Sequence, residues 1–498
     1  MAIVDKTRKL LHQKRWENCT PLPANTAAGS FIVSDKYDLI PNSLAFLMIN
    51  YSSCWRLDGD QNSMAIQLPN SGMAGTFGAG ACGEFRALGA MGGVFDQPAT
   101  GGGVGFINTN KTIVRDMGAN EAKPVFIRVI KGSGLGFEGY VKRNLIGANS
   151  VIYVKNLDGS PATETFSATT VFHVFSGSWW VQGAGASAGF AVWDLATSAW
   201  TQRAAVGVTW GTDGQLVSTI GLVADFFSST STGSNTSTTI NDTTKNFLVN
   251  QWANYQVHIV GGTGKGQIRE IASNTATAIT VSAAWDVTPD ATSVYDIEGN
   301  YNQFFLGGNT AVTFYRYKVS TNAWTTLAPT VARAGAMGAG ASLNWIDGVD
   351  LWDLLANGQP DLLTSTIYRQ KGRYLLSFRG GASNVLDVYD IALNTWINGI
   401  AYGNQQETFT TGSSSFDYAG FIYLAKESTG RLLRFNVKKW QMEAFAFQPM
   451  PQGTVLVGQK IYMLPYIDGG VETNFLYMLR HTGAEIFRMK LIDTGAQD

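Results

Sequence analysis

The residues whose types and spacing could do chemistry are concentrated in one aspartate-rich segment. Its four carboxylates are Asp347, Asp350, Asp353 and Asp361. Carboxylates this close in sequence could bind calcium or act as the acid and base of a glycosidase. The spacing of an EF-hand loop is absent, and so is a Ser-x-Asp-x-Gly-x-x-Trp box. We therefore interpret the segment as a solvent-exposed insertion loop. A carbohydrate-active enzyme that uses Asp347, Asp350 or Asp353 is our third functional hypothesis.

Two glycine-rich segments have the composition of phosphate-binding loops without their context. Residues 78–83 match G-x-G-x-x-G, which binds a dinucleotide when it lies between a strand and a helix. No helix is predicted around them, so close-packed strands or turns are expected. In residues 261–266, Lys265 is followed by glycine where a phosphate loop needs Ser or Thr to bind magnesium. A hairpin turn is predicted there, and no cofactor.

The histidines and cysteines form no catalytic or metal-binding arrangement. They are scattered, at His12, His173, His258 and His481 and at Cys19, Cys54 and Cys82. His173 and His258 lie in alternating apolar patterns, which are typical of histidines in strands. The cysteines are odd in number and lack the spacing of a metal site, and no Ser–His–Asp arrangement is indicated. We expect a non-enzymatic protein without a metal, made in a reducing cytoplasm.

Composition and charge exclude several classes of protein. The 498 residues include 27 Phe, 18 Tyr and 14 Trp, an aromatic content that excludes intrinsic disorder. A net charge of -1 gives no long-range attraction to phosphate, so no sequence-specific nucleic-acid binding is expected, although a local basic patch is compatible with it. The apolar run at 44–49 is far shorter than the roughly 20 residues of a membrane-spanning helix. The charged first residues lack the apolar stretch of a signal peptide.

The chain is predicted to be all-β from residue 31 onward. Short runs rich in β-branched and aromatic residues alternate with clusters of Gly, Asn, Asp, Ser and Thr. Antiparallel strands are favoured, because parallel crossovers need helical stretches of about a dozen residues. Only the first residues favour a helix, which Asp5 would cap and which would end before Pro21. We expect this basic N-terminal arm to be solvated or to dock on a neighbouring subunit.

A segment that ends in tryptophan recurs along the chain. Each copy combines an aromatic-bearing strand, a tight polar turn and a strand opened by a tryptophan that we expect to be buried. The copies end at Trp200, Trp324, Trp396 and, more loosely, Trp440, and glycine pairs at Gly307, Gly308, Gly380 and Gly381 follow apolar strands in two of them. Glycine lets neighbouring strands approach closely. The pattern resembles the kelch-type blade of β-propellers over about residues 176–465, which implies a tryptophan wedged between neighbouring blades.

A second repeat accounts for the excess length between Trp200 and Trp324, which lie 124 residues apart. Gly132, Gly134, Gly136 and Asn144 reappear 130 positions later as Gly262, Gly264, Gly266 and Asn274. Turns of this kind need glycine for backbone at positive φ. Two mutually similar β-modules are therefore predicted at 122–175 and 245–298. Units of about 50 residues bury little surface alone, so each should pack on its blade or on a neighbouring subunit.

The predicted organisation places both modules inside the propeller sequence. In residues 228–243, 11 of 16 are Ser or Thr, and this run is predicted to be a flexible connector before the second module. The segments are an N-terminal arm at 1–30, first propeller strands at 31–121, the first module at 122–175, a blade at 176–226, connector and second module at 227–298, and remaining blades at 299–498.

The second module resembles small β-modules in virion proteins of tailed bacteriophages. The resemblance covers Asn250 to Tyr295, and residues 14–17, 27–31 and 68–72 are also similar to phage structural proteins. It implies a non-enzymatic structural protein of the neck or tail, such as a ring-forming nozzle or hub component, assembled in the host cytoplasm and located in the virion. Its partners would be copies of itself and portal, adaptor, tail or fibre proteins. A receptor- or glycan-binding fibre or decoration protein is the alternative.

Overall fold

The computed structural model describes the chain as strands and loops. It covers residues 97–114, 116–118, 125–175, 177–184, 188–219 except 211 and 212, 227–345 except 299, 301 and 302, and 373–400, together with further strands and a few flanking residues between 16 and 491. No helix occurs among these residues, and none is therefore long and apolar enough to cross a membrane. The predicted N-terminal helix up to residue 15, together with Cys19, His12 and His481, lies outside them.

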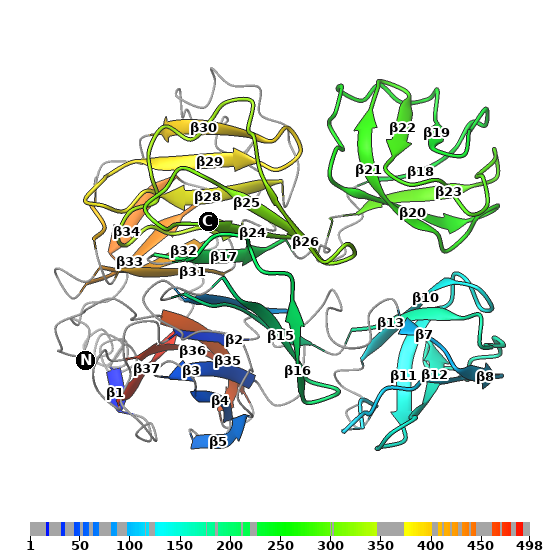
Figure 1. Cartoon of the computed structure of the whole chain (residues 1–498), viewed down its shortest axis with the longest axis horizontal. Coiled ribbons are helices and arrows are strands. Elements are labelled where there is room, and N and C mark those ends of the chain that lie inside the picture. Colours follow the sequence, from blue (N-terminus) through cyan, green and yellow to red (C-terminus); the bar gives the residue numbers. More distant parts are fainter. Residues whose placement is uncertain are drawn as a thin grey trace, which may run out of the picture.

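Six four-stranded antiparallel sheets form a β-propeller (Figure 1). Blade 1 is β2 (Phe31–Ser34), β3 (Leu44–Ile49), β4 (Ser53–Asp58) and β5 (Ser63–Leu68); blade 2 is β6 (Cys82–Arg86), β14 (Ser178–Gln182), β15 (Phe190–Asp194) and β16 (Ala199–Arg203); blade 3 is β17 (Gln215–Ser218), β24 (Gln303–Gly307), β25 (Tyr315–Lys318) and β26 (Ala323–Thr326). Blade 4 is β27 (Asn344–Trp345), β28 (Tyr374–Phe378), β29 (Leu386–Asp390) and β30 (Thr395–Ile400); blade 5 is β31 (Ser414–Tyr418), β32 (Phe421–Lys426), β33 (Arg431–Asn436) and β34 (Gln441–Ala444). Blade 6 is β35 (Ile461–Asp468), β36 (Val471–Leu479), β37 (Ile486–Leu491) and β1 (Trp16–Asn18).

The innermost strands close the propeller into a ring. β2 contacts β6, β6 contacts β17, β17 contacts β27, β27 contacts β31, β31 contacts β35, and β35 contacts β2 again. Blade 6 joins both ends of the chain, because Trp16 of β1 pairs with Met489 of β37. The expectation that residues 1–30 form only an arm is therefore wrong for β1. A strand from one terminus completes a sheet made by the other, and a local sequence pattern carries no sign of that pairing.

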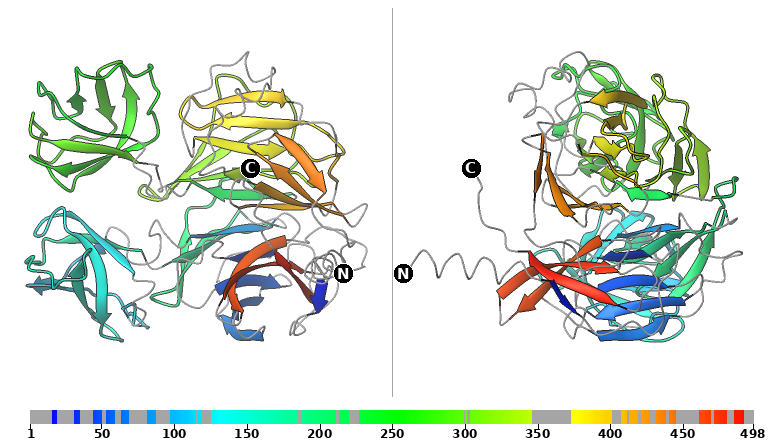
Figure 2. Two further views of the ribbon diagram at one scale, coloured as in Figure 1. Left: turned by 180° about the vertical axis from the view of Figure 1, so that it is seen from behind. Right: turned by 90° about the vertical axis from the view of Figure 1, so that its left-hand side faces the viewer.

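Two smaller sheets are inserted at equivalent points of neighbouring blades. Module 1 lies between β6 and β14 of blade 2, and module 2 lies between β17 and β24 of blade 3. Module 1 contains β7 (Gln97–Pro98), β8 (Gly101–Gly103), β9 (Phe106–Asn108), β10 (Phe126–Lys131), β11 (Glu138–Asn144), β12 (Val151–Asn156) and β13 (Val171–Val174). Module 2 contains β18 (Phe227–Thr230), β19 (Thr239–Asn241), β20 (Gln256–Gly261), β21 (Ile268–Asn274), β22 (Ala278–Val281) and β23 (Val294–Glu298). Figures 1 and 2 show both modules on one side of the propeller.

The modules share strand order and irregularities, which confirms the predicted fold class of a propeller with two similar inserted modules. The order β7-β13-β10-β11-β12-β9 in module 1 matches β18-β23-β20-β21-β22-β19 in module 2. A bulge between Val129 and Lys131 has its counterpart between Ile259 and Gly261. Both sheets begin earlier than the predicted residues 122 and 245, because strands upstream of each repeated segment complete them.

The Ser/Thr-rich run is part of module 2, so the prediction of a flexible connector is wrong. Residues 228–243 contain most of β18 and all of β19. The turn between these strands folds back on β19, with Thr232 N donating to Asn241 O at 2.9 Å and Asn241 N donating to Asn235 Oδ1 at 2.7 Å. In module 1 the strand β8 covers the same edge. The Ser, Thr and Asn residues of this run thus form hydrogen bonds along a sheet edge. A rule that predicts disorder from composition alone does not take such bonds into account.

The repeated tryptophans occupy equivalent positions in the outer strands of blades 2 to 4. Trp200, Trp324 and Trp396 are each the second residue of their strand and pair with an aromatic residue of the preceding strand. Trp396 is 2% exposed because Arg333 of the preceding loop lies over its ring, at 5.2 Å from the ring centroid. Trp200 and Trp324 are less buried than Trp396, and both pack against the core that blades 2 and 3 share.

The wedge between blades is aromatic, as the kelch resemblance implies. The Trp324 ring of blade 3 lies 5.1 Å from that of Phe190 in blade 2, measured between centroids. The Trp396 ring of blade 4 lies 5.2 Å from that of Phe314, which precedes the third strand of blade 3. Trp440 breaks the pattern, because Met442 occupies the position of Trp396 in blade 5.

Trp440 is nevertheless fully buried, at a φ of +53°, in the core that blades 4 and 5 share.

The predicted glycines lie where strands meet loops. Gly308, at a φ of +122°, has no room for a Cβ, which would collide with the Asp213 carbonyl before β17. At Gly380 a Cβ would collide with Ala341 N before β27, and Gly307 and Gly381 flank these two sites.

Candidate functional site: two modules fixed to each other and to the propeller

The repeated glycines form the same tight turn in both modules. Gly132, Gly134, Gly136, Gly262, Gly264 and Gly266 all have positive φ, between +70° and +91°. Lys265 N donates to Gly262 O at 3.2 Å, as Leu135 N donates to Gly132 O at 3.1 Å in module 1. Asn144 and Asn274 also have matching roles, because their Oδ1 atoms accept from the main-chain N of Met117 and Trp252 at 2.7 and 2.8 Å.

The two turns meet at their tips. A Cβ placed on Gly266 would collide with the N and Cα atoms of Gly136, and one placed on Gly136 would lie 3.4 Å from Gly266 Cα. The contact joins two equivalent positions of the repeat, as a two-fold axis between like subunits would do. The modules therefore pack as a pair within one chain, and their glycines serve this contact as well as the turn.

A buried carboxylate also joins the two modules. In β23, Glu298 Oε1 forms a hydrogen bond of 3.0 Å with His258 Nδ1. Arg128 Nη1 of module 1 lies 3.6 Å from the other carboxylate oxygen, Oε2. Arg128 Nε also lies 2.6 Å from Glu138 Oε1 within module 1. Burial alone would raise the pKa of Glu298, but the hydrogen bond with His258 and the charge of Arg128 outweigh it and hold the pKa at about 2. Glu298 is therefore an anion at any physiological pH.

Module 1 docks on a turn of blade 2, the blade into which it is inserted. Val114 N donates to Ala196 O at 2.9 Å. Ala196 is fully buried and belongs to the apolar core of the module. The turn is shaped by Asp194, whose Oδ1 accepts from Thr197 N at 2.7 Å. The turn that follows β15 is thus a fixed seat for the module.

Module 2 docks on the equivalent turn of blade 4, one blade beyond its own. Asp390 stands at the position of Asp194, and its two carboxylate oxygens each accept from Arg373 Nε at 3.0 Å. Arg373 Nη1 also donates a hydrogen bond to Gln251 O of the module at 2.7 Å. Both Arg373 and Asp390 are buried, so this ion pair connects blade 4 to the module away from solvent.

A second group of contacts holds module 2 on the blades. Asn254 Nδ2 donates to Ile391 O at 3.2 Å, and its Oδ1 accepts from Arg316 Nη1 of blade 3 at 2.7 Å. Ala392, the residue that matches Ala196, is buried in the core of module 2. Lys318 of blade 3 adds an ion pair with Glu270 at 2.5 Å. Module 2 therefore bridges blades 3 and 4.

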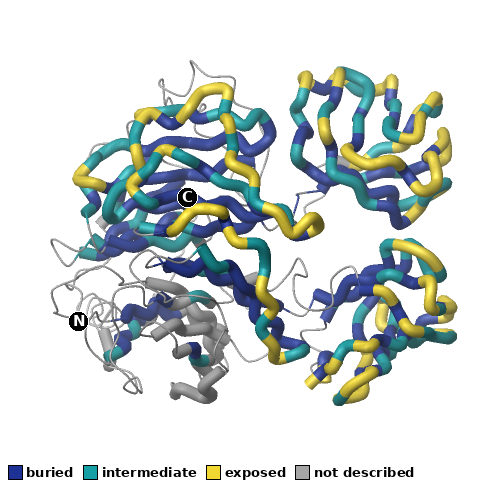
Figure 3. Tube along the Cα trace, viewed as in Figure 1, coloured by how far each residue is buried: buried dark blue, intermediate teal, exposed yellow. Residues whose placement is uncertain are grey.

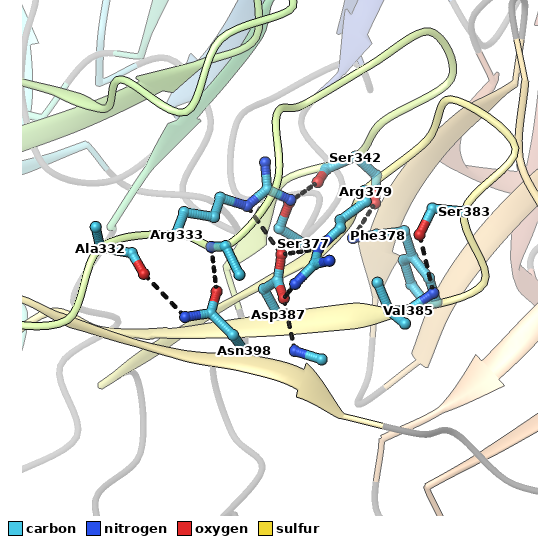
Figure 4. Close-up of polar contacts among 12 residues, drawn as sticks. Ala332, Arg333, Ser342, Ser377, Phe378, Arg379, Ser383, Val385, Asp387 and Asn398 are labelled. Carbon is cyan, nitrogen blue, oxygen red and sulfur yellow. Dashed lines mark hydrogen bonds and ion pairs between the residues drawn. The ribbon is translucent and has the colours of Figure 1, made fainter.

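A buried ion cluster fixes the loop between blades 3 and 4 (Figure 4). The Asp387 carboxylate accepts from Arg333 Nε at 3.0 Å, from Arg379 Nε and Nη2 at 2.8 Å each, and from Gly399 N at 2.9 Å. Arg333 Nη2 also donates to Ser377 Oγ at 2.9 Å. Burial lowers the pKa of Arg333 to about 10, which leaves it charged at neutral pH. Because its carboxylate is saturated by donors, the cluster has a structural role.

The other polar residues singled out in the sequence have structural positions where they are described. His173 and His258 are buried in β13 and β20, and Gly83 of β6 packs against Phe31 of blade 1, where a Cβ would lie 2.6 Å from the ring. Asp347, Asp350, Asp353 and Asp361 lie outside the described residues. Within the described part of the chain, no group of three or more His, Cys, Asp or Glu residues could hold a metal ion.

Exposed apolar side chains concentrate on the modules (Figure 3 shows the exposed segments). Of eleven large apolar side chains that are exposed in the described residues, eight lie on the modules: Val104, Val114, Leu145, Ile146, Leu157, Leu248, Val249 and Val287. Val114 and Val249 lie close to the contact between module and propeller, because Val114 N donates to Ala196 O and Val249 is two residues before Gln251, whose O accepts from Arg373. The modules thus carry most of the apolar surface that a partner could cover.

Comparison with known proteins gives similar folds of low identity only. No protein-family model and no curated protein matches the chain. A structural-genomics protein of unknown function from Bacteroides thetaiotaomicron is 10% identical, over 91% of this chain and 82% of that one, with a TM-score of 0.29. A chain of the mitotic checkpoint complex is 9% identical, over 96% of this chain and 91% of that one, with a TM-score of 0.33. At these scores neither likeness carries an argument about function.

Proposed function

We propose that this chain is a non-enzymatic structural protein of a tailed phage virion, and that it assembles as a ring in the neck or tail. In this proposal the propeller is a rigid scaffold, and the paired modules contact neighbouring copies and the adjoining portal, adaptor, tail or fibre proteins. The resemblance of module 2 and of the N-terminal segments to phage virion proteins supports the proposed location in a virion. The arrangement of the modules supports the role.

The observation that carries the proposal is that the modules are held rigidly and yet expose apolar side chains. Buried contacts through Glu298, Arg373 and Ala196 fix them to each other and to blades 2 and 4. Their outer surfaces retain Ile146 and Val249, which are 64% and 67% exposed. A rigid appendage with an uncovered apolar surface is suited to subunit contact, because little conformational entropy is lost when a partner covers it.

The oligomeric state of the purified full-length protein tests this proposal. We expect a ring-sized assembly by mass photometry, and a shift towards monomer when Ile146→Ser and Val249→Ser are combined. Val331→Ser is the matched control, because Val331 is 52% exposed but lies on the propeller. It should leave the assembly intact. A monomeric wild type, or an assembly that survives the double substitution, contradicts the proposal. A monomer that binds host cells would favour the receptor-binding alternative instead.

A further inference from the structure

The outward face of module 1 combines aromatic and basic side chains. Successive residues of a strand point to opposite faces of its sheet. In β11 and β12, Val141, Ile152 and Val154 are buried in the core of the module. The residues between them therefore line the opposite face, together with Phe106 of β9 and with Arg143, which a bulge after Val141 places opposite Tyr153. This outer set is Phe106, Tyr140, Lys142, Arg143, Tyr153 and Lys155, and we call it the aromatic–basic face.

Strand register brings these side chains together. Arg143 pairs with Tyr153, which pairs with Phe106 on the next strand, and Tyr140 pairs with Lys155. The Arg143 guanidinium lies 4.3 Å from the centroid of the Tyr153 ring, and that ring lies 6.0 Å from that of Phe106. Lys142 and Arg143 are exposed, and the aromatic rings are half-buried. The result is a layer of flat groups with cations at its surface.

Module 2 shows that the fold does not require this face. Its register places Thr239, Glu270, Ala272, Ser273, Thr280 and Ser282 at the positions of Phe106, Tyr140, Lys142, Arg143, Tyr153 and Lys155. None of these residues is aromatic or basic, although the two modules share strand order and bulges. The aromatic and basic residues of module 1 therefore serve something other than folding of the module.

The edge strand β8, which pairs with β9, carries no side chains that could cover the Phe106 ring. β8 consists of Gly101, Gly102 and Gly103, and a Cβ on Gly103 would lie 2.5 Å from the Phe106 ring. Because Gly103 has no Cβ, the Phe106 ring can lie over the edge strand. Within β9, β11 and β12, the one carboxylate on this face is Glu138, which Arg128 already pairs with at 2.6 Å. The charge of the exposed face is therefore positive.

We propose that the aromatic–basic face binds single-stranded nucleic acid without sequence specificity. Flat side chains on which bases stack, flanked by cations for the phosphates, are the two components that such binding uses. Bases stack on the plane of an arginine as well as on aromatic rings, so Arg143 over Tyr153 offers a stacking surface. Lys142 precedes Arg143 in β11 and Lys155 follows Tyr153 by two residues in β12, so both cations lie next to this surface for the backbone. The net charge of -1 for the whole chain is compatible with this local positive face.

Fluorescence anisotropy with the full-length protein and a labelled oligothymidylate of about twenty nucleotides tests the proposal. We expect saturable binding that weakens as salt rises from about 50 to about 200 mM. Three cations that contact phosphates of a single strand predict a slope of about -2 in a plot of log affinity against log salt. A duplex of the same length should bind more weakly, because its bases are not available for stacking.

Substitutions borrowed from module 2 localise the binding with little risk to folding. Tyr153→Thr and Arg143→Ser introduce the residues that the same fold holds at Thr280 and Ser273. Each should weaken binding about tenfold, and Arg143→Ser should also reduce the salt slope by about 0.7. Thr280→Ala in module 2 is the control and should leave the affinity unchanged, with thermal unfolding recorded for every variant.

Three results would overturn the proposal. The first is no saturable binding of the oligonucleotide at low salt. The second is binding that Tyr153→Thr and Arg143→Ser leave unchanged in variants that unfold as the wild type does. The third is equal competition by poly-glutamate, which would assign the face to acidic protein segments. None of these results depends on the oligomeric state, so they test this site separately from the proposed ring assembly.

Discussion

Arg128 of module 1 and Glu298 of module 2 form an ion pair between two parts of the chain that are inserted in different blades. Their Nη1 and Oε2 atoms lie 3.6 Å apart, and the side chains are 6% and 9% exposed. His258, which lies 130 positions after Arg128, binds the other oxygen of the same carboxylate. Equivalent residues of the repeat thus share one partner, and the two modules behave as a single appendage of the propeller.

Removing the shared carboxylate should weaken the module pair. Glu298→Gln leaves the Arg128 guanidinium buried with Glu138 as its remaining partner, and breaking a buried ion pair on one side costs about 3 kcal/mol. We expect a lower unfolding temperature by calorimetry and faster hydrogen exchange in β10 and β20. Glu443→Gln removes a half-exposed pair with Arg434 on blade 5 and should cost less than about 1 kcal/mol. Equal effects of the two substitutions would contradict a special role for Glu298.

The stability of the module pair should depend on pH in the acid range. The folded-state pKa of Glu298 is about 2, below its ordinary value of 4.5. A group whose pKa is depressed on folding stabilises the protein above the unfolded-state value, and this contribution is lost as pH falls through the folded-state value. The difference in stability between wild type and Glu298→Gln should therefore shrink by about 3 kcal/mol between pH 4.5 and pH 2. A constant difference across this range would contradict the assigned charge.

The contact between the two glycine turns should not tolerate a side chain. In Gly266→Ala the new Cβ would collide with Gly136 and would also require φ near +91°. Gly399→Ala is the control, because Gly399 has a φ of +70° but no atom within 4 Å of the added Cβ. The control should lose about 1 kcal/mol from backbone strain alone. Gly266→Ala should lose clearly more in the same denaturation experiment, and an equal loss would show that the turns do not depend on their contact.

The buried tryptophan of blade 4 should contribute more to stability than its half-buried counterpart in blade 3. Trp396→Ala removes a ring that packs against Phe314 of the neighbouring blade, and such changes cost about 3–5 kcal/mol. Trp324→Ala should cost less, because Trp324 is less buried than Trp396. Thermal unfolding of both variants measures the difference. A larger loss for Trp324→Ala would contradict the burial described here.

Sequence patterns predicted the parts of this fold that local chemistry determines. Period-two patterns predicted strands, and the repeated Gly-x-Gly-x-Gly predicted two similar modules, because positive φ leaves glycine as the favoured residue. The pairing of Gly136 with Gly266, the docking of Ala392 in module 2 and the closure of blade 6 by Trp16 depend on contacts between distant segments. No local pattern encodes them. The aromatic–basic face could have been predicted from the sequence. When the two repeats are aligned, Tyr140 corresponds to Glu270 and Arg143 to Ser273, so module 1 alone has aromatic and basic residues there.

Electron cryo-microscopy of purified virions that contain this protein tests the central claim most directly. We predict that the propeller forms a ring in the neck or tail, and that modules 1 and 2 contribute most of the surface between neighbouring copies. Exposed residues such as Ile146 and Val249 should then be covered by a partner. A map in which both modules project freely into solvent, or in which the protein is absent from the neck and tail, would contradict the account.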